Sequence, residues 1–93
     1  MKHISPILAS ILSRHGLEQG IVERQIFLRW DEILGDLSRR TRPLEIRGRE
    51  LWIQVDHAPL MQHLGFLAPR IMARLRELVP GTTVQRLRFT LKG

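Results

Sequence analysis

Residues 41–55 read TRPLEIRGRELWIQV and hold two short apolar segments on either side of RGRE. Gly48 suits the left-handed position of a tight turn between them. On the second segment the alternation separates Leu51, Ile53 and Val55 from Trp52 and Gln54. Leu44 and Ile46 supply the matching apolar positions of the first segment. The stretch therefore predicts an antiparallel hairpin, strands 41–46 and 51–55, with one covered face and one open face.

Two helices are predicted before the hairpin. The first covers residues 5–15, with Ser5 as its cap, Pro6 at its first position and Gly16 after its end. The second covers residues 20–34 and ends at Gly35. Its apolar stripe comprises Val22, Ile26, Trp30 and Ile33, with Phe27 and Leu34 beside them. Trp30 lies on this stripe, so we interpret it as a core residue.

Residues 58–78 show the strongest helical periodicity of the chain. The repeating apolar positions are Leu60, Leu64, Leu67, Ile71, Leu75 and Leu78. Gly65 and Pro69 interrupt this pattern, which predicts a bend or two abutting helices there. Asp56 or His57 is expected to cap the helix ahead of Pro59.

The last segment, residues 84–93, is predicted to be a strand. Leu87, Phe89 and Leu91 would point inward, and Arg86, Arg88 and Thr90 outward. The element order predicts an α+β domain, with a three-stranded sheet and helices packed on one face. Without the first helix, the order α-β-β-α-α-β is that of the type II KH fold. Ninety-three residues suit a single domain, residues 1–93.

Composition excludes several classes of protein. The chain has no cysteine, which rules out disulfides and Cys-ligated zinc, and its 43% hydrophobic content argues against general disorder. The N-terminal region is too polar for a signal peptide, and no stretch approaches the ~18 apolar residues of a membrane span. We therefore expect a cytoplasmic protein with no membrane partner.

The basic charge is concentrated in one part of the chain. Residues 1–38 carry four basic and five acidic residues, whereas residues 39–93 carry eleven basic and four acidic ones. Thirteen of the fifteen basic residues are arginine, whose planar guanidinium suits phosphate groups and stacks on bases. This asymmetry favours binding to a polyanion, with solubility alone as the alternative.

The candidate contact surface is the open face and rim of the sheet. Its arginines are Arg39, Arg40, Arg42, Arg47, Arg49, Arg86 and Arg88. Trp52 is the candidate for stacking on a base, as in single-strand binding. Alternatively, Trp52 lies beneath an N-terminal helix, and the edge arginines only discourage sheet-to-sheet aggregation. Arg70 and Arg74, one helical turn apart, either extend the basic surface or form a solvated helix face.

Catalysis and metal binding have little support. His57 and His63 are six residues apart and fall on different sides of a helix, with no further ligand cluster nearby. The sequence contains neither a nucleophile elbow nor a glycine-rich phosphate loop. We therefore expect no enzymatic activity, no cofactor and no metal.

Four fragments follow one another along the chain: WDEILG, PLEIRGRELWIQV, VDHAPLMQHLGFLAPRIMARLREL and VQRLRFTL. Together, in this order and spacing, they resemble the N-terminal domain of the bacterial DciA family. The resemblance implies a KH-like domain that binds DNA and acts in replication with the DnaB helicase, as a loader or accessory factor. The G-x-x-G clamp of KH modules has no counterpart, because the corresponding stretch reads LGFLAPR.

The sequence thus leads to one main functional hypothesis and two alternatives. The main hypothesis is a nucleoid-associated protein that binds single-stranded or forked DNA without base specificity and assists the replicative helicase. The first alternative is a protein–protein adaptor that uses an exposed Phe66 or the open sheet edge to meet an acidic partner. The second is an RNA-binding KH-like protein, because arginine density does not distinguish RNA from DNA.

Overall fold

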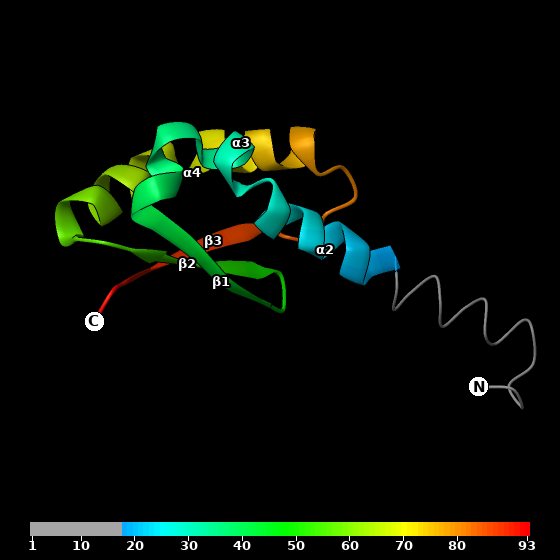
Figure 1. Ribbon diagram of the computed structural model, residues 1–93, viewed down its shortest axis with the longest axis horizontal. Helices are drawn as coiled ribbons and strands as arrows, with labels where there is room; N and C mark the ends of the chain where they lie inside the picture. Colours follow the sequence, from blue (N-terminus) through cyan, green and yellow to red (C-terminus); the bar gives the residue numbers. More distant parts are fainter. Residues whose placement is uncertain (1–17) are drawn as a thin grey trace, which may run out of the picture.

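The computed structural model describes residues 18–93, in which helices cover one face of a three-stranded sheet (Figure 1). The helical segments are α2 (Glu18–Leu28), α3 (Trp30–Leu34), the 3-10 segment η2 (Gly35–Arg40) and α4 (Ala58–Leu78). The strands are β1 (Thr41–Arg47), β2 (Glu50–Val55) and β3 (Arg86–Leu91). This architecture confirms the predicted KH-like α+β class. The helix expected over residues 5–15 lies outside the described residues.

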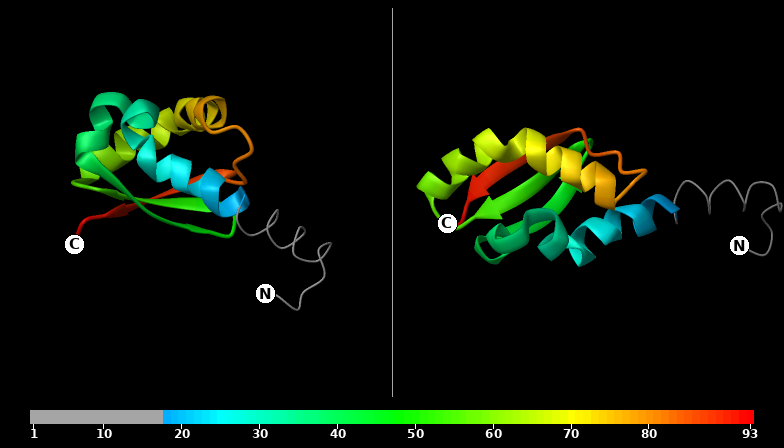
Figure 2. Two further views of the ribbon diagram at one scale, coloured as in Figure 1. Left: turned by 45° about the vertical axis from the view of Figure 1, so that its right-hand side comes forward. Right: turned by 90° about the horizontal axis from the view of Figure 1, so that it is seen from above.

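The sheet is mixed, with β2 at its centre. β1 and β2 pair antiparallel, and Gly48 adopts a φ of 64° in the turn between them, as predicted from the sequence. β2 and β3 pair parallel, because the chain returns through α4 before it enters β3. From above, α4 and the α2–α3 segment form two rows across the same face of the sheet (Figure 2).

The core lies between these two rows and the covered face of β2. Leu51, Ile53 and Val55 are almost completely buried. The helices contribute Ile26, Trp30, Ile33, Leu34, Leu60, Leu64, Ile71, Met72 and Leu75. The alternation expected for β2 is therefore confirmed: its odd-numbered residues face the helices, and Trp52 and Gln54 face away from them.

Trp30 occupies the core position predicted for it. Its side chain is 6% exposed, and the indole Nε1 donates a hydrogen bond of 3.1 Å to Oγ1 of Thr41. The Thr41 hydroxyl in turn donates to the carbonyl of Leu37 at 2.8 Å. These bonds satisfy the polar atoms that the core buries and fix the start of β1 against α3.

The prediction for Leu44 is wrong. A β-bulge between Pro43 and Glu45 places Leu44 outside the paired register and leaves it 41% exposed. Pro43 instead lies opposite Ile53 at the position that faces the helices. Proline cannot donate to the strand ladder, so it fits an edge strand beside an irregularity of this kind.

The second predicted helix is broken at Arg29. Arg29 has φ −104° and ψ 22°, which separates α2 from α3. Its guanidinium Nη1 donates to the carbonyl of Leu78 at the end of α4, at 2.6 Å. Gly35, with a φ of 61°, ends α3 as expected, whereas Phe27 is 37% exposed and does not join the buried stripe.

Residues 58–78 form one continuous helix, so the predicted pair of abutting helices is wrong. Pro69 lies inside α4 and has no N–H to donate to the carbonyl four residues earlier. The packing of Leu64, Ile71 and Leu75 against the sheet on both sides of Pro69 outweighs that missing bond. At the start of the helix, His57 is the cap, and its Nδ1 accepts the N–H of Leu60 at 3.3 Å.

Candidate nucleic-acid interface

The open face of the sheet is the surface that the described helices leave uncovered. Strand alternation and register bring nine side chains to it: Arg42, Glu45 and Arg47 from β1, Glu50, Trp52 and Gln54 from β2, and Arg86, Arg88 and Thr90 from β3. Arg86 and Arg88 therefore share one face, as strand alternation predicted, and the parallel pairing of β2 and β3 places Trp52 on the same face. We call these nine residues the open face.

Trp52 lies at the centre of the open face between two arginines. The Cζ atom of Arg47 is 5.1 Å from the centroid of the indole ring, and that of Arg88 is 5.4 Å away. Arg88 reaches the ring because it is the register partner of Trp52 on β3. The tryptophan is half-buried, and its Nε1 is covered and has no hydrogen-bond partner among the described residues. The alternative in which a helix buries Trp52 does not hold for α2, α3 or α4, because these helices lie on the other face of the sheet.

Two of the four open-face arginines are paired with carboxylates. Arg47 contacts Glu45 through two hydrogen bonds, of 3.0 and 3.3 Å. Arg86 lies 3.8 Å from a carboxylate oxygen of Glu50. Arg42 and Arg88 make no ion pair with any residue in 18–93, so they are the cations most available to an external anion.

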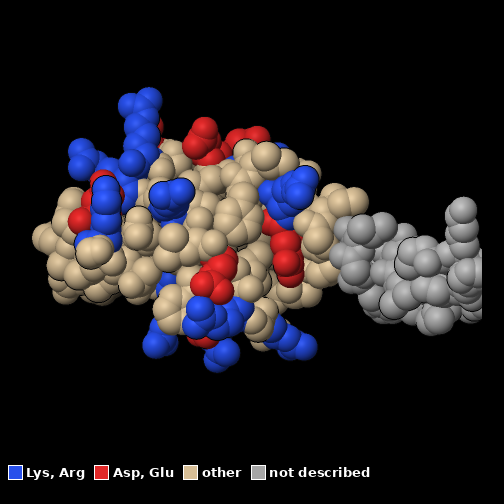
Figure 3. Space-filling view, turned by 60° about the horizontal axis from the view of Figure 1, so that its bottom comes forward, with Lys and Arg blue, Asp and Glu red and all other residues tan. Residues whose placement is uncertain are grey.

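The basic side chains do not form one continuous patch. Figure 3, which turns the sheet side forward, shows blue side chains over much of the surface with red ones and uncharged areas between them. An anion that follows this surface would therefore meet alternating cations, carboxylates and one aromatic ring. That pattern suits attachment at several spaced phosphates better than a single deep anion site.

Arg39 and Arg40 lie at the end of η2, ahead of β1, and both are exposed. Arg39 borders a hollow together with Asp31 and Asp36, in the helical layer. It is therefore beside two carboxylates and apart from the open face. Of the five arginines between residues 39 and 49, the structure brings only Arg42 and Arg47 to the open face. Arg39 and Arg40 are separated from them because η2 turns the chain before β1 begins.

Arg49 points away from the open face as well. It borders a hollow beside the loop of residues 82–85, together with Arg76 from the last turn of α4. The Arg49 carbonyl accepts the N–H of Gln85 at 2.8 Å, which holds the turn against this loop. The closeness of Arg76 to Arg49 was not predicted from the sequence, because it depends on how α4 crosses back over the sheet.

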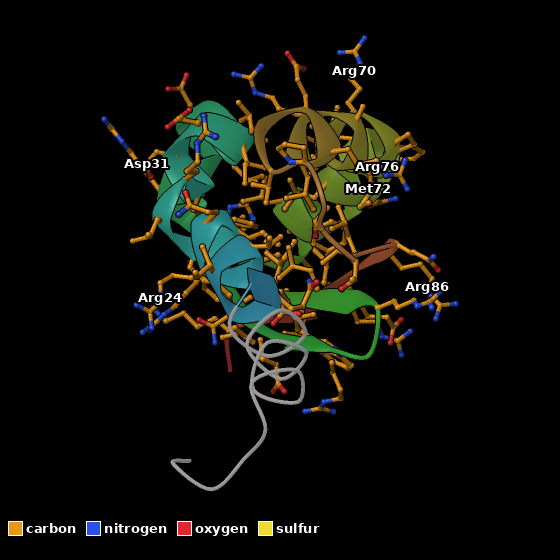
Figure 4. All side chains as sticks on the ribbon, turned by 90° about the vertical axis from the view of Figure 1, so that its right-hand side faces the viewer. Arg24, Asp31, Arg70, Met72, Arg76 and Arg86 are labelled. Carbon is orange, nitrogen blue, oxygen red and sulfur yellow. The ribbon has the colours of Figure 1, made fainter. Side chains whose placement is uncertain are left out.

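Arg70 and Arg74 behave differently from each other. Arg70 projects from α4 on the side of the helical layer away from the sheet (Figure 4). Arg74 donates from Nε to the carbonyl of Glu32 at 2.8 Å, so it fastens α4 to α3. The two residues therefore do not extend the open face.

Arg29 and Glu32 form an ion pair at 2.8 Å on the helical layer. The hydrogen bond from Arg29 lowers the pKa of Glu32 below its ordinary value, and the same bond raises the pKa of Arg29. Arg29, Arg74 and Glu32 together connect the two rows of helices. These three charged side chains therefore stabilise the packing of the helices.

Within residues 18–93, no three histidine, cysteine or carboxylate side chains lie close enough together to hold a metal ion. No helix in that part of the chain is long and apolar enough to cross a membrane.

Comparison with known proteins adds one decisive observation. The family model described as "Dna[CI] antecedent, DciA" matches residues 3–89, nearly the whole chain. The chain belongs to the DciA family. No curated protein matches the sequence. Membership in the DciA family implies a role in DNA replication related to loading of the DnaB helicase, and it confirms the resemblance read from the sequence.

Proposed function

We propose that this DciA-family domain binds DNA, single-stranded or forked, through its open face while it assists the replicative helicase. The observation that carries the proposal is Trp52, half-buried between Arg47 and Arg88 on the uncovered face of the sheet. A ring for a base and guanidinium groups for the flanking phosphates are what single-strand binding requires. The guanidinium groups themselves also present flat surfaces on which a base stacks.

The mechanism is electrostatic and largely independent of base sequence. Arg42 and Arg88 neutralise phosphates first, because neither is paired within the described residues. Arg47 and Arg86 contribute less, because Glu45 and Glu50 already lie beside them. Each phosphate contact releases a counterion, so affinity falls with the logarithm of the salt concentration. None of the helices in residues 18–93 lies on this face, so none of them is positioned to read base edges in a major groove.

Fluorescence anisotropy tests the proposal with labelled single-stranded DNA, forked duplex DNA and RNA of equal length, at low and near-physiological salt. The variant Arg88→Glu should weaken DNA binding by about tenfold or more, a difference of ~1.4 kcal/mol, and should reduce the salt slope. Arg70→Glu is the matched control, since it changes the net charge equally on the side of α4 away from the sheet.

Each result has a definite meaning. Loss of binding in Arg88→Glu with retention in Arg70→Glu supports the open face as the site. Equal losses in both variants would mean that only the net charge matters, which would contradict the assignment. Tighter binding to RNA than to either DNA would favour the RNA alternative.

One observation supports the alternative function as a protein–protein adaptor. Phe66 is 78% exposed on α4, on the helical side of the molecule, where no described residue covers it. A partner protein that docks there would leave the open face free for DNA. The variant Phe66→Ser would then reduce helicase binding and leave DNA binding unchanged, which pull-down and anisotropy measurements with the same protein distinguish.

A further inference from the structure

A groove runs between α4 and the outer edge of β3. It has a volume of about 400 Å³. Its walls are Ala68, Pro69 and Met72 from α4, Gln85 just ahead of β3, residues 86–88 within β3, and Glu50 from β2. In Figure 4, Met72 faces this side of the molecule, with Arg76 projecting from α4 above it and Arg86 from the sheet below. The nucleic-acid proposal uses two residues at the rim of this groove, Arg86 and Arg88, but neither its apolar wall on α4 nor the backbone edge of β3.

β3 is an edge strand whose outer backbone groups have no partner strand in the described part of the chain. Arg86 donates its N–H to the carbonyl of Arg49 at 3.2 Å, and Lys92 donates to Val55 at 2.9 Å, so both point toward β2. The N–H and C=O of one strand residue point the same way and alternate along the strand. Those of Leu87 and Phe89 therefore point outward, along the groove.

An unpaired strand edge beside an apolar wall is where an extended peptide adds as a further strand. The edge supplies main-chain hydrogen bonds. The alternation of β3 predicts which side chains of the added peptide lie on each side of the sheet. Peptide residues that face the helix would contact Ala68, Pro69 and Met72. Those that face the other way would lie beside Arg86 and Arg88.

The charges on either side of the groove select the kind of peptide. Arg86 and Arg88 line it from the strand, and Arg76 lies one helical turn beyond Met72. The one carboxylate on the groove walls, Glu50, is already 3.8 Å from Arg86. A partner strand with acidic side chains opposite the arginines gains favourable cross-strand pairs.

We infer that the groove between α4 and the outer edge of β3 binds an extended acidic segment of a partner protein, in which acidic and apolar residues alternate. The segment adds as a fourth strand beside β3, with its apolar side chains on Met72 and its carboxylates beside Arg86 and Arg88. A second copy of this chain fits poorly, because pairing β3 with β3 would place these two arginines close to their own copies.

The test uses the whole chain and three fluorescein-labelled eight-residue peptides. The first alternates valine and glutamate, the second has the same composition in two blocks, and the third repeats the first with alternate amides N-methylated on the edge that would face β3. The alternating peptide should bind with a dissociation constant on the order of 10–100 µM, as expected for an interface below the standard size. The other two should bind at least about tenfold more weakly, because they lose the side-chain alternation or the backbone hydrogen bonds.

Two substitutions on the same helix provide the matched pair. Ala68→Arg fills the groove wall and should abolish peptide binding, although it adds a positive charge. Ala73→Arg places the same side chain on the exposed side of α4 and should leave binding unchanged. Thermal unfolding of both variants checks that each is folded. Amide exchange of Leu87 and Phe89 should slow when the alternating peptide is bound.

Several outcomes would overturn the inference. They are absence of saturable binding, equal binding of the N-methylated peptide, or undiminished binding to Ala68→Arg, which would indicate charge attraction alone. Self-association that is abolished by Ala68→Arg would assign the groove to a second copy instead. Because Ala68 lies off the open face, Ala68→Arg should retain DNA binding, so failure of this inference is distinguishable from failure of the proposed function.

Discussion

The two faces of β2 carry opposite kinds of side chain at successive positions. On one face Leu51, Ile53 and Val55 are sealed beneath two rows of helices. On the other face Trp52 lies between arginines, with no described helix above it. The covered face accounts for the fold, and the open face has chemistry that the fold does not require. In a domain this small, one strand therefore serves both stability and the candidate function.

The arginines divide in the same way. Arg29 and Arg74 donate to backbone carbonyls of other helices and hold the helical layer together. Arg42 and Arg88 on the open face make no comparable bond with any residue in 18–93. Arginines bonded to carbonyls are already committed to the protein, whereas those that face solvent are available to phosphate or carboxylate groups. The position of each arginine is therefore more informative than the total number.

The sharpest test of the two-face comparison uses neighbouring residues of β2. Ile53→Ala removes a side chain that is 0% exposed and should lower the free energy of unfolding by about 2–5 kcal/mol. Gln54→Ala, on the open face, should change it by less than ~0.5 kcal/mol. Urea denaturation followed by circular dichroism measures both. Similar losses in the two variants would mean that the open face is also part of the core.

The two tryptophans give the second test. Trp30→Phe removes the hydrogen bond to Thr41 and leaves unfilled volume in the core, so it should cost about 1–3 kcal/mol. Trp52→Phe removes a covered Nε1 that has no described partner, and weakens only two cation–π contacts, so it should cost less than ~1 kcal/mol. Chemical unfolding of both variants under one condition gives the comparison. A larger loss for Trp52→Phe would show that its role is mainly structural.

The sequence predicted those features that depend on local patterns. The alternation of residues 51–55, the turn at Gly48, the buried Trp30 and the cap at His57 follow from short-range periodicity and backbone preferences, and the structure confirms them. Of the two outcomes predicted around Pro69, a bend or two abutting helices, the second is wrong, because tertiary packing on both sides of Pro69 maintains one helix. The prediction for Leu44 is wrong because a single bulge reverses the direction in which a side chain points.

The candidate site was harder to predict, because it depends on contacts between distant parts of the chain. Arg88 and Trp52 are brought together by the parallel pairing of β2 and β3, which the sequence alone does not specify. The same crossover places Arg49 beside Arg76 and removes it from the open face. A run of arginines in the sequence was therefore interpreted as one cluster, whereas the fold distributes it over three surfaces.

The smallest expected effect concerns the charges of the helical layer. The pKa of Glu32 is lowered in the folded state by its hydrogen bond from Arg29, so the pair stabilises the fold above the ordinary glutamate pKa of about 4.3. That contribution is lost as the pH falls through the lowered pKa of the folded state. Stability of the original protein should therefore decrease more steeply between about pH 5 and 3 than that of Glu32→Gln, in which this group does not titrate. Urea midpoints across this range measure the difference. Parallel curves would mean that the Arg29–Glu32 pair adds nothing, and that the backbone bonds of Arg29 and Arg74 alone join the helices.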